Sequence, residues 1–172
     1  MKPVGVVRRI DELGRIVIPK EIRKTLRIHY GESLEIFATE DSIVLKKYSK
    51  LNSLEKLAGG YCETLHYILN ENIYISNRDV IISGKGKYQK ELIGTNISEV
   101  VENIMNEKKI YVSDKNYEYE IVKNFKLNCY ILVIPINADG EIIGSLISFK
   151  ENEPISNILK TSCSIAAGLI IN

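Results

Sequence analysis

The first 50 residues constrain the fold most, because they are too short a piece of chain to bury a secure core alone. Their β-branched content and polar breaks predict four short strands, at 4–10, 15–19, 33–39 and 43–48. Pro19 fits the first position of a helix over 20–28. Because this piece has no cysteine for a disulfide, we expect two copies to pair or interleave and so cover the edges of the sheet.

Positive charge is concentrated in the same 50 residues. They carry 11 Lys and Arg against 7 Asp and Glu, a net charge of +4, whereas residues 51–172 carry 12 against 15, a net charge of −3. A basic segment joined to a mildly acidic one is typical of a polyanion-binding module with a second domain. On the expected helix, four cations share an arc of about 100° opposite Ile22 and Leu26. They are Lys20, Arg23, Lys24 and Arg27.

The motifs in this piece resemble those of a known family. GVVRRIDELGRIVIPKEIRKTLRI and LEIFATEDSIVLKKY, residues 5–28 and 34–48, are similar to the N-terminal domain of the AbrB family of bacterial transition-state regulators. The resemblance implies that residues 1–50 form a swapped-hairpin β-barrel dimer with a short helix, and that this dimer binds double-stranded DNA. The family's DNA contacts fall here on Arg8, Arg15, Arg23 and Lys24, to which we add Arg9.

The candidate DNA-binding side chains are therefore Arg8, Arg9, Arg15, Lys20, Arg23, Lys24 and Arg27. Leu13 and Gly14 are expected to shape the loop that presents Arg15. Lysine at position 24 keeps the charge but lacks the planar fork that grips a guanine or a phosphate at two points. Since few Asn or Gln side chains accompany these cations, phosphate contacts and DNA shape are expected to dominate recognition.

Residues 51–172 have the periodicity of a second folded domain. The patterns predict helices at 53–69, 98–109 and 156–171 and strands at 72–76, 80–83, 117–123, 129–136 and 141–150. ADGE, at 138–141, predicts a hairpin turn between the last two strands. SGKGKYQKE, at 83–91, lacks the spacing of a phosphate-binding loop and predicts a surface loop instead.

The order of these elements resembles a GAF domain, the small-molecule sensor module, over about residues 56–172. The resemblance implies an α+β fold, with helices flanking an antiparallel sheet, and it places a pocket for any ligand between the sheet and residues 84–97. The sequence does not identify that ligand, and its two His and three Cys lack the spacing of a metal site. Leu65 and Leu159, on the first and last helices, are expected to join dimers into tetramers.

Two alternatives remain open. The same N-terminal fold occurs in antitoxins, but their short disordered tails differ from the patterned residues 51–172. Some GAF-like proteins reduce methionine sulfoxide with cysteine thiols, but Cys62 and Cys163 lie on apolar helix stripes, where buried hydrophobes are expected. With no apolar run of membrane-spanning length and reduced thiols expected, the sequence favours a cytoplasmic protein without a cofactor. The resemblance implies that this protein is a homo-oligomeric transcription regulator of sporulation genes and not an enzyme.

Overall fold

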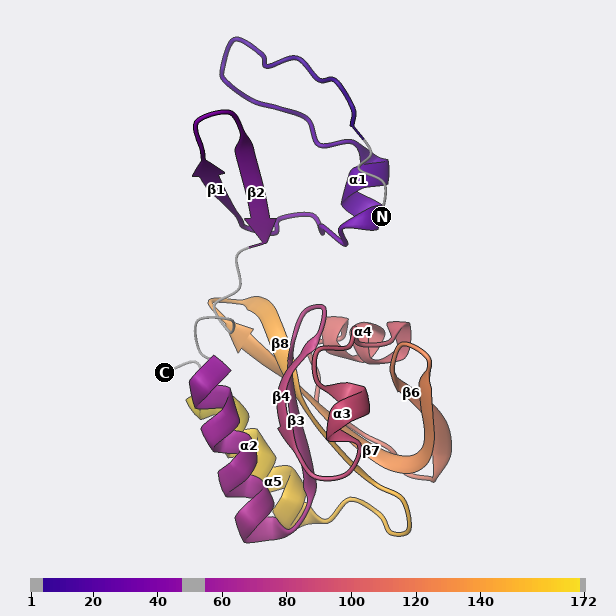
Figure 1. Ribbon diagram of the computed structural model, residues 1–172. Coiled ribbons are helices and arrows are strands. Elements are labelled where there is room, and N and C mark those ends of the chain that lie inside the picture. The colour runs from indigo at the N-terminus through magenta and orange to yellow at the C-terminus, as the bar shows by residue number, and fades with distance from the viewer. Residues whose placement is uncertain (1–4, 48–54, 171–172) are drawn as a thin grey trace. The chain divides into compact units, whose positions relative to one another are not determined.

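The computed structural model describes residues 5–47 and 55–170 of the 172-residue chain (Figure 1). The chain divides into two compact units, Met1–Tyr48 and Ser49–Asn172. Residues 48–54, which span the boundary expected between residues 1–50 and 51–172, lie outside the described residues. Among the described residues, no helix is both long and apolar enough to cross a membrane.

The N-terminal unit contains one helix and one hairpin. Helix α1 covers Lys20–Thr25, strand β1 covers Leu34–Ala38 and strand β2 covers Ile43–Lys47. The two strands are antiparallel, with Ile36 opposite Leu45, so both predicted strands of this half are confirmed. An isolated two-stranded hairpin is at best marginally stable, so this unit needs further packing.

The strands predicted at 4–10 and 15–19 are not formed within one protomer. In the described part of the chain, residues 5–10 and 15–19 run as extended segments without strand pairing (Figure 1). They meet at a loop, where the backbone N–H of Asp11 donates to the carbonyl of Arg15 at 3.1 Å. A strand requires a neighbour for its backbone groups, and within residues 5–47 of one protomer these segments have none.

Helix α1 ends three residues earlier than the sequence predicts. The N–H of Arg27 donates to the Lys24 carbonyl at 3.3 Å, and the N–H of Ile28 donates to the Arg23 carbonyl at 2.7 Å. Arg27 has a φ of 53°, in the left-handed region. These two bonds and this conformation make a Schellman motif that ends the helix. Arg27 therefore does not lie on the helix face that carries Lys20, Arg23 and Lys24, and its predicted place in that arc is wrong.

The C-terminal unit is built on an antiparallel sheet whose strands differ in length. Its strands follow the order β4-β3-β8-β7-β5, and β6 also pairs with β7. The strands are β3 (Asn72–Asn77), β4 (Ile81–Lys85), β5 (Tyr111–Val112), β6 (Tyr117–Val122), β7 (Phe125–Ala138) and β8 (Glu141–Lys150). The helices are α2 (Glu55–Leu69), α3 (Gln89–Leu92), α4 (Glu99–Asn106) and α5 (Asn157–Leu169).

The turn between β7 and β8 confirms the prediction from ADGE. Ala138 pairs with Glu141, and the two residues between them, Asp139 and Gly140, have φ values of 53° and 84°. Positive φ at both central residues is the mark of the type I′ turn, whose twist matches that of the flanking strands. The α+β class and the antiparallel sheet with flanking helices are likewise as predicted.

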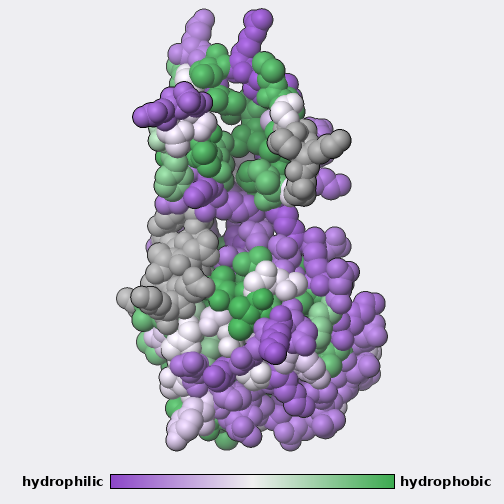
Figure 2. All heavy atoms as spheres, in the orientation of Figure 1, coloured by the Kyte–Doolittle hydropathy of each residue, from purple (hydrophilic) through white to green (hydrophobic). Residues whose placement is uncertain are grey.

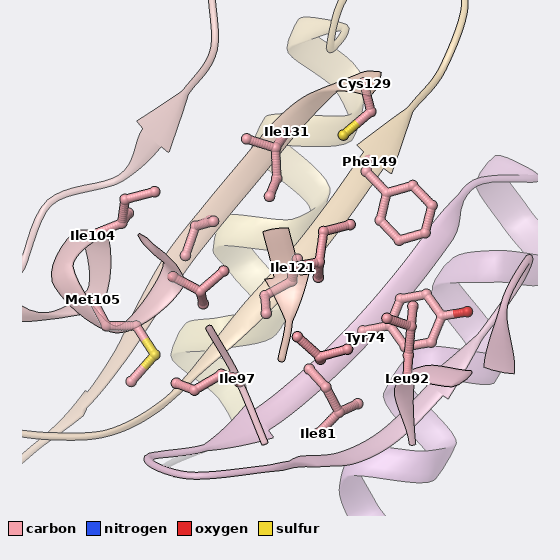
Figure 3. Packing of buried hydrophobic residues seen from close by; sticks show 14 of the residues in the cluster. Tyr74, Ile81, Leu92, Ile97, Ile104, Met105, Ile121, Cys129, Ile131 and Phe149 are labelled. Atoms are coloured by element: carbon pink, nitrogen blue, oxygen red, sulfur yellow. The ribbon is translucent and has the colours of Figure 1, made fainter. Parts of the chain in front are cut away.

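The sheet has an apolar core on each face. Helices α2 and α5 cover one face, where Ala58, Cys62, Leu65, Leu159 and Cys163 pack against the strands. The other face holds a cluster that includes Tyr74, Leu92, Ile97, Val101 and Phe149 (Figure 3). The rings of Tyr74 and Phe149 stack with centroids 5.7 Å apart.

This second core fills the space in which the sequence places a ligand pocket. Leu92 and Ile97 belong to the segment over that space, and both are fully buried in the cluster that also contains Tyr74 (Figure 3). Residues 83–91 are not a plain surface loop either, because they contain the end of β4 and the first three residues of helix α3. A Cβ at Gly84 would lie 2.0 Å from the Tyr74 ring, so glycine permits this close packing.

Candidate nucleic-acid interface

The seven predicted DNA-binding residues all belong to the N-terminal unit, and six of them are exposed. Arg8 and Arg9 lie on the extended segment 5–10, and Arg15 follows the loop. Lys20, Arg23 and Lys24 project from α1, whereas Arg27 is half-buried beyond its end. The exposed cations therefore come from two places. One is the pair of extended segments on either side of the loop, and the other is helix α1.

The loop between the two extended segments is closed by its first residue, Asp11. Oδ1 of Asp11 accepts the backbone N–H of Leu13 at 3.0 Å and that of Arg15 at 2.8 Å. The Gly14 N–H donates to the Asp11 carbonyl at 2.9 Å, and Gly14 has a φ of 77°, which glycine adopts without strain. Oδ2 of Asp11 accepts Nε–H of Arg15 at 2.7 Å. These bonds from Arg15 and Leu13 hold the pKa of the Asp11 carboxyl below its usual value.

Sequence reasoning missed Asp11, since the polar break DELG was interpreted only as a turn shaped by Leu13 and Gly14. The signal was present, because an aspartate at the first position of a turn can accept the N–H groups that follow it. Asp11 thus joins the residues that shape the candidate interface.

The two lysines of β2 have structural contacts. Nζ of Lys46 lies 5.0 Å from the centroid of the Phe37 ring. Nζ of Lys47 donates to the Arg27 carbonyl at 2.6 Å and lies 3.5 Å from a carboxylate oxygen of Glu32. Lys47 therefore ties the chain after α1 to the hairpin and is less available to a ligand than the cations of α1.

The N-terminal unit exposes much apolar surface. Green side chains gather on its visible face in Figure 2, and the hairpin is open on both sides, since Ile36 and Leu45 are exposed on one and Phe37 and Val44 on the other. The exposed apolar residues of this unit are Val6, Val7, Ile10, Leu13, Ile16, Val17, Leu26, Tyr30, Ile36, Phe37, Ile43, Val44 and Leu45. So large a share of exposed apolar side chains marks an interaction surface.

The C-terminal unit has a second exposed apolar surface, on the outer sides of α2 and α5. Leu57 and Ile68 are exposed on α2, and Ile158, Ile165 and Leu169 are exposed on α5. Their spacings of 7 and 11 residues place them on one stripe of each helix. We name these five residues the outer stripe. Leu65 and Leu159, predicted to join dimers, are only 9% and 1% exposed and face the sheet, so that assignment is wrong.

The fold of the C-terminal unit is that of GAF domains. The GAF domain of an Acinetobacter phosphoenolpyruvate-protein phosphotransferase matches 68% of this chain and 79% of its own, with a TM-score of 0.58 and 10% identity. A type II free methionine-R-sulfoxide reductase from Thermoplasma acidophilum matches 69% of this chain and 92% of its own, with a TM-score of 0.54 and 14% identity. At these identities the likeness shows the fold alone.

Sequence comparison covers both units. The family model described as Stage V sporulation protein T C-terminal, transcription factor, matches residues 53–171, and the one described as Antidote-toxin recognition MazE, bacterial antitoxin, matches residues 7–52. Stage V sporulation protein T of Bacillus subtilis is 37% identical over 99% of this chain and 97% of its own. Transition state regulatory protein AbrB of the same organism is 37% identical over 52% of this chain and 84% of its own.

These likenesses define a two-domain transcription regulator related to AbrB. The chain belongs to the stage V sporulation protein T family.

Proposed function

We propose that the protein regulates transcription of sporulation genes by binding double-stranded DNA as a homodimer of its N-terminal units. The observation that carries this proposal is the combination, within residues 5–47, of exposed cations with apolar surface that one protomer leaves open. A second copy would bury the apolar surface and double the cations about a two-fold axis. That symmetry suits a DNA duplex, whose phosphates attract such a surface.

We assign residues 1–50 to DNA binding and residues 51–172 to self-association. The DNA contacts are proposed to come from Arg8, Arg9, Arg15, Lys20, Arg23 and Lys24. Arg27 is proposed as a minor contact, because it is half-buried at the end of α1. Since side chains fill the space beneath residues 84–97, the GAF-like domain is proposed to act as an oligomerisation module rather than through a ligand there.

The outer stripe supports self-association of the C-terminal units. Two apolar helix faces of matching spacing on each protomer can pack against those of a second copy, as in other helix–helix interfaces. Together with the N-terminal dimer, this contact would give tetramers made of paired dimers.

An antitoxin is the second candidate, because the MazE model matches residues 7–52. Antitoxins that share this N-terminal fold carry a short disordered tail that wraps the toxin. Here residues 55–170 instead form a sheet with a core on each face. Recovery of a small toxin in equal amount with the tagged protein would support the antitoxin, and recovery of promoter DNA alone would support the regulator.

The three cysteines are proposed to be structural, and the protein to catalyse no reaction. Burial raises the pKa of Cys62, Cys129 and Cys163 to about 12 each, from an ordinary value of 9.0. At pH 8 the folded protein should therefore hold about 1,000-fold less thiolate, the reactive form, than the denatured chain. A chromogenic disulfide reagent should react correspondingly more slowly before denaturant is added. Rapid reaction of the folded protein, with turnover of methionine sulfoxide, would contradict this proposal.

The same pKa shifts set a pH dependence of stability. Because the folded thiols keep their protons above pH 9 while unfolded thiols lose theirs, the stability that they contribute is fully present below about pH 9. It should fall as the pH rises towards 12.

A fragment of residues 1–50 should be dimeric and should still bind DNA. The reason is that the core of this unit needs a second copy but not the GAF-like domain. Sedimentation equilibrium would give its mass, and fluorescence anisotropy with a labelled duplex would give its affinity. A folded, monomeric fragment would overturn the interleaved dimer, and a dimer that binds no duplex would overturn the DNA-binding role.

A further inference from the structure

The carboxylate of Asp11 divides its two oxygens between two tasks. Oδ1 accepts the backbone N–H groups of Leu13 and Arg15 and so closes the loop. Oδ2 lies 2.7 Å from Nε of Arg15 and holds the side chain. The two side chains are 42% and 71% exposed, so this pair lies at the surface of the candidate interface.

The contact at Nε leaves a definite part of the Arg15 guanidinium for a ligand. An arginine carries five N–H donors in a rigid fork, and Nε supplies only one of them. With Nε bonded to Asp11, the terminal edge formed by Nη1 and Nη2 remains for a contact at two points with a guanine or a phosphate. A side chain already held in one orientation also loses less freedom on binding than a mobile one.

We propose that Asp11 is a positioning residue that aims the terminal edge of Arg15 at the DNA and thereby contributes to sequence selectivity. The inference rests on the proposed DNA-binding function. A carboxylate beside a DNA-facing arginine repels the phosphates and lowers affinity for every sequence. Asp11 therefore lowers the affinity for DNA of any sequence but keeps the Arg15 side chain in one orientation.

Replacement by asparagine separates the two tasks. In Asp11→Asn, the remaining Oδ1 can still accept both backbone N–H groups, whereas the amide nitrogen that replaces Oδ2 is a donor and cannot accept Nε–H. The loop is kept and the Arg15 side chain is released. Glu12→Gln is the matched control, because it removes the same charge from the adjacent exposed residue. Asp11→Ser is a second variant whose hydroxyl can close the turn but has no carboxylate for Arg15.

The test compares two duplexes of equal length at one salt concentration. One is selected from a random pool by the wild-type protein, and the other is a scrambled version of it. Selectivity is the ratio of the Kd for the scrambled duplex to the Kd for the selected duplex. We expect Glu12→Gln to tighten binding to both duplexes equally and so to leave this ratio unchanged. Asp11→Asn and Asp11→Ser should tighten binding to the scrambled duplex yet reduce the ratio about 10-fold. In the Arg15→Ala background, Asp11→Asn should not change the ratio further.

The outcomes separate this inference from the function on which it rests. A wild-type protein that binds neither duplex would overturn the proposed function. A wild-type protein that prefers the selected duplex, with the same preference in Asp11→Asn, Asp11→Ser and Glu12→Gln, would leave that function standing and overturn the role of Asp11. The thermal unfolding midpoint and the mass of each variant would show whether its fold and dimer are intact.

Discussion

Ile36→Asp should dissociate the N-terminal dimer and raise its dissociation constant at least about 100-fold. Ile36 is 70% exposed in one protomer, so an aspartate there costs little in the single chain. In the dimer its face is proposed to be buried. Burial of one such side chain is worth about 1.5–3 kcal/mol, and the symmetric interface contains it twice.

Sedimentation of the fragment of residues 1–50 measures this effect, and anisotropy with the full-length protein measures its consequence for DNA. Because dissociation halves the number of cations that face one duplex, DNA affinity should fall with it. Ser33→Asp is the control, since it adds the same charge at an exposed polar residue immediately before β1. A dimer as tight in Ile36→Asp as in Ser33→Asp would place the interface elsewhere.

Two substitutions on α5 should have different effects: Leu159→Asp should lower the stability of the GAF-like unit, whereas Ile165→Asp should lower only the mass of the assembly. Leu159 is 1% exposed, so an aspartate there buries a charge without a partner and should destabilise the GAF-like unit by at least about 4 kcal/mol. Its thermal midpoint should fall by about 15 °C. Ile165 is 59% exposed on the outer stripe, so its replacement should leave the midpoint unchanged.

Light scattering distinguishes the two variants. Ile165→Asp should halve the mass of the full-length protein, because paired dimers would separate into dimers while each unit stays folded. If the mass stays constant in Ile165→Asp, the outer stripe does not join protomers. If Leu159→Asp is as stable as the wild type, its side chain does not face the sheet.

Much of the C-terminal fold could be predicted from local pattern alone. Strand β8 was predicted with its bounds of 141–150, and Asp139 and Gly140 indicated the turn before it, because that turn type demands residues that accept positive φ. Helix α3 and strand β5, of four and two residues, are too short for any periodicity to appear. Strand β5 is set by its pairing with β7, later in the chain, and helix α3 by the burial of Leu92 in the second core.

The errors have physical causes that a single sequence does not display. A helical stripe shows which residues share a face, but not which face meets the sheet, and so Leu65 and Leu159 were assigned to the wrong side. The left-handed conformation that ends α1 falls on Arg27 rather than on a glycine, the usual signal for it. The strands expected at 4–10 and 15–19 depend on a partner that one protomer lacks.

The exposure of six of the seven cations could be expected from the sequence, because charged side chains rarely lie buried. The restraint of Arg15 by Asp11 could not be, because that contact depends on how the loop closes.

The salt dependence of DNA affinity tests the central claim most directly. If each protomer offers about four phosphate contacts, a dimer makes about eight, and log affinity against log salt should have a slope of about −7. Arg15→Ala and Arg23→Ala each remove two contacts from the dimer, so they should weaken binding to every sequence and flatten the slope by about 2. Lys46→Ala and Lys47→Ala should change it less, because Lys46 stacks on Phe37 and Lys47 binds the Arg27 carbonyl. Equal slopes in the wild type and all four variants would contradict the account and place the DNA on another face of the protein.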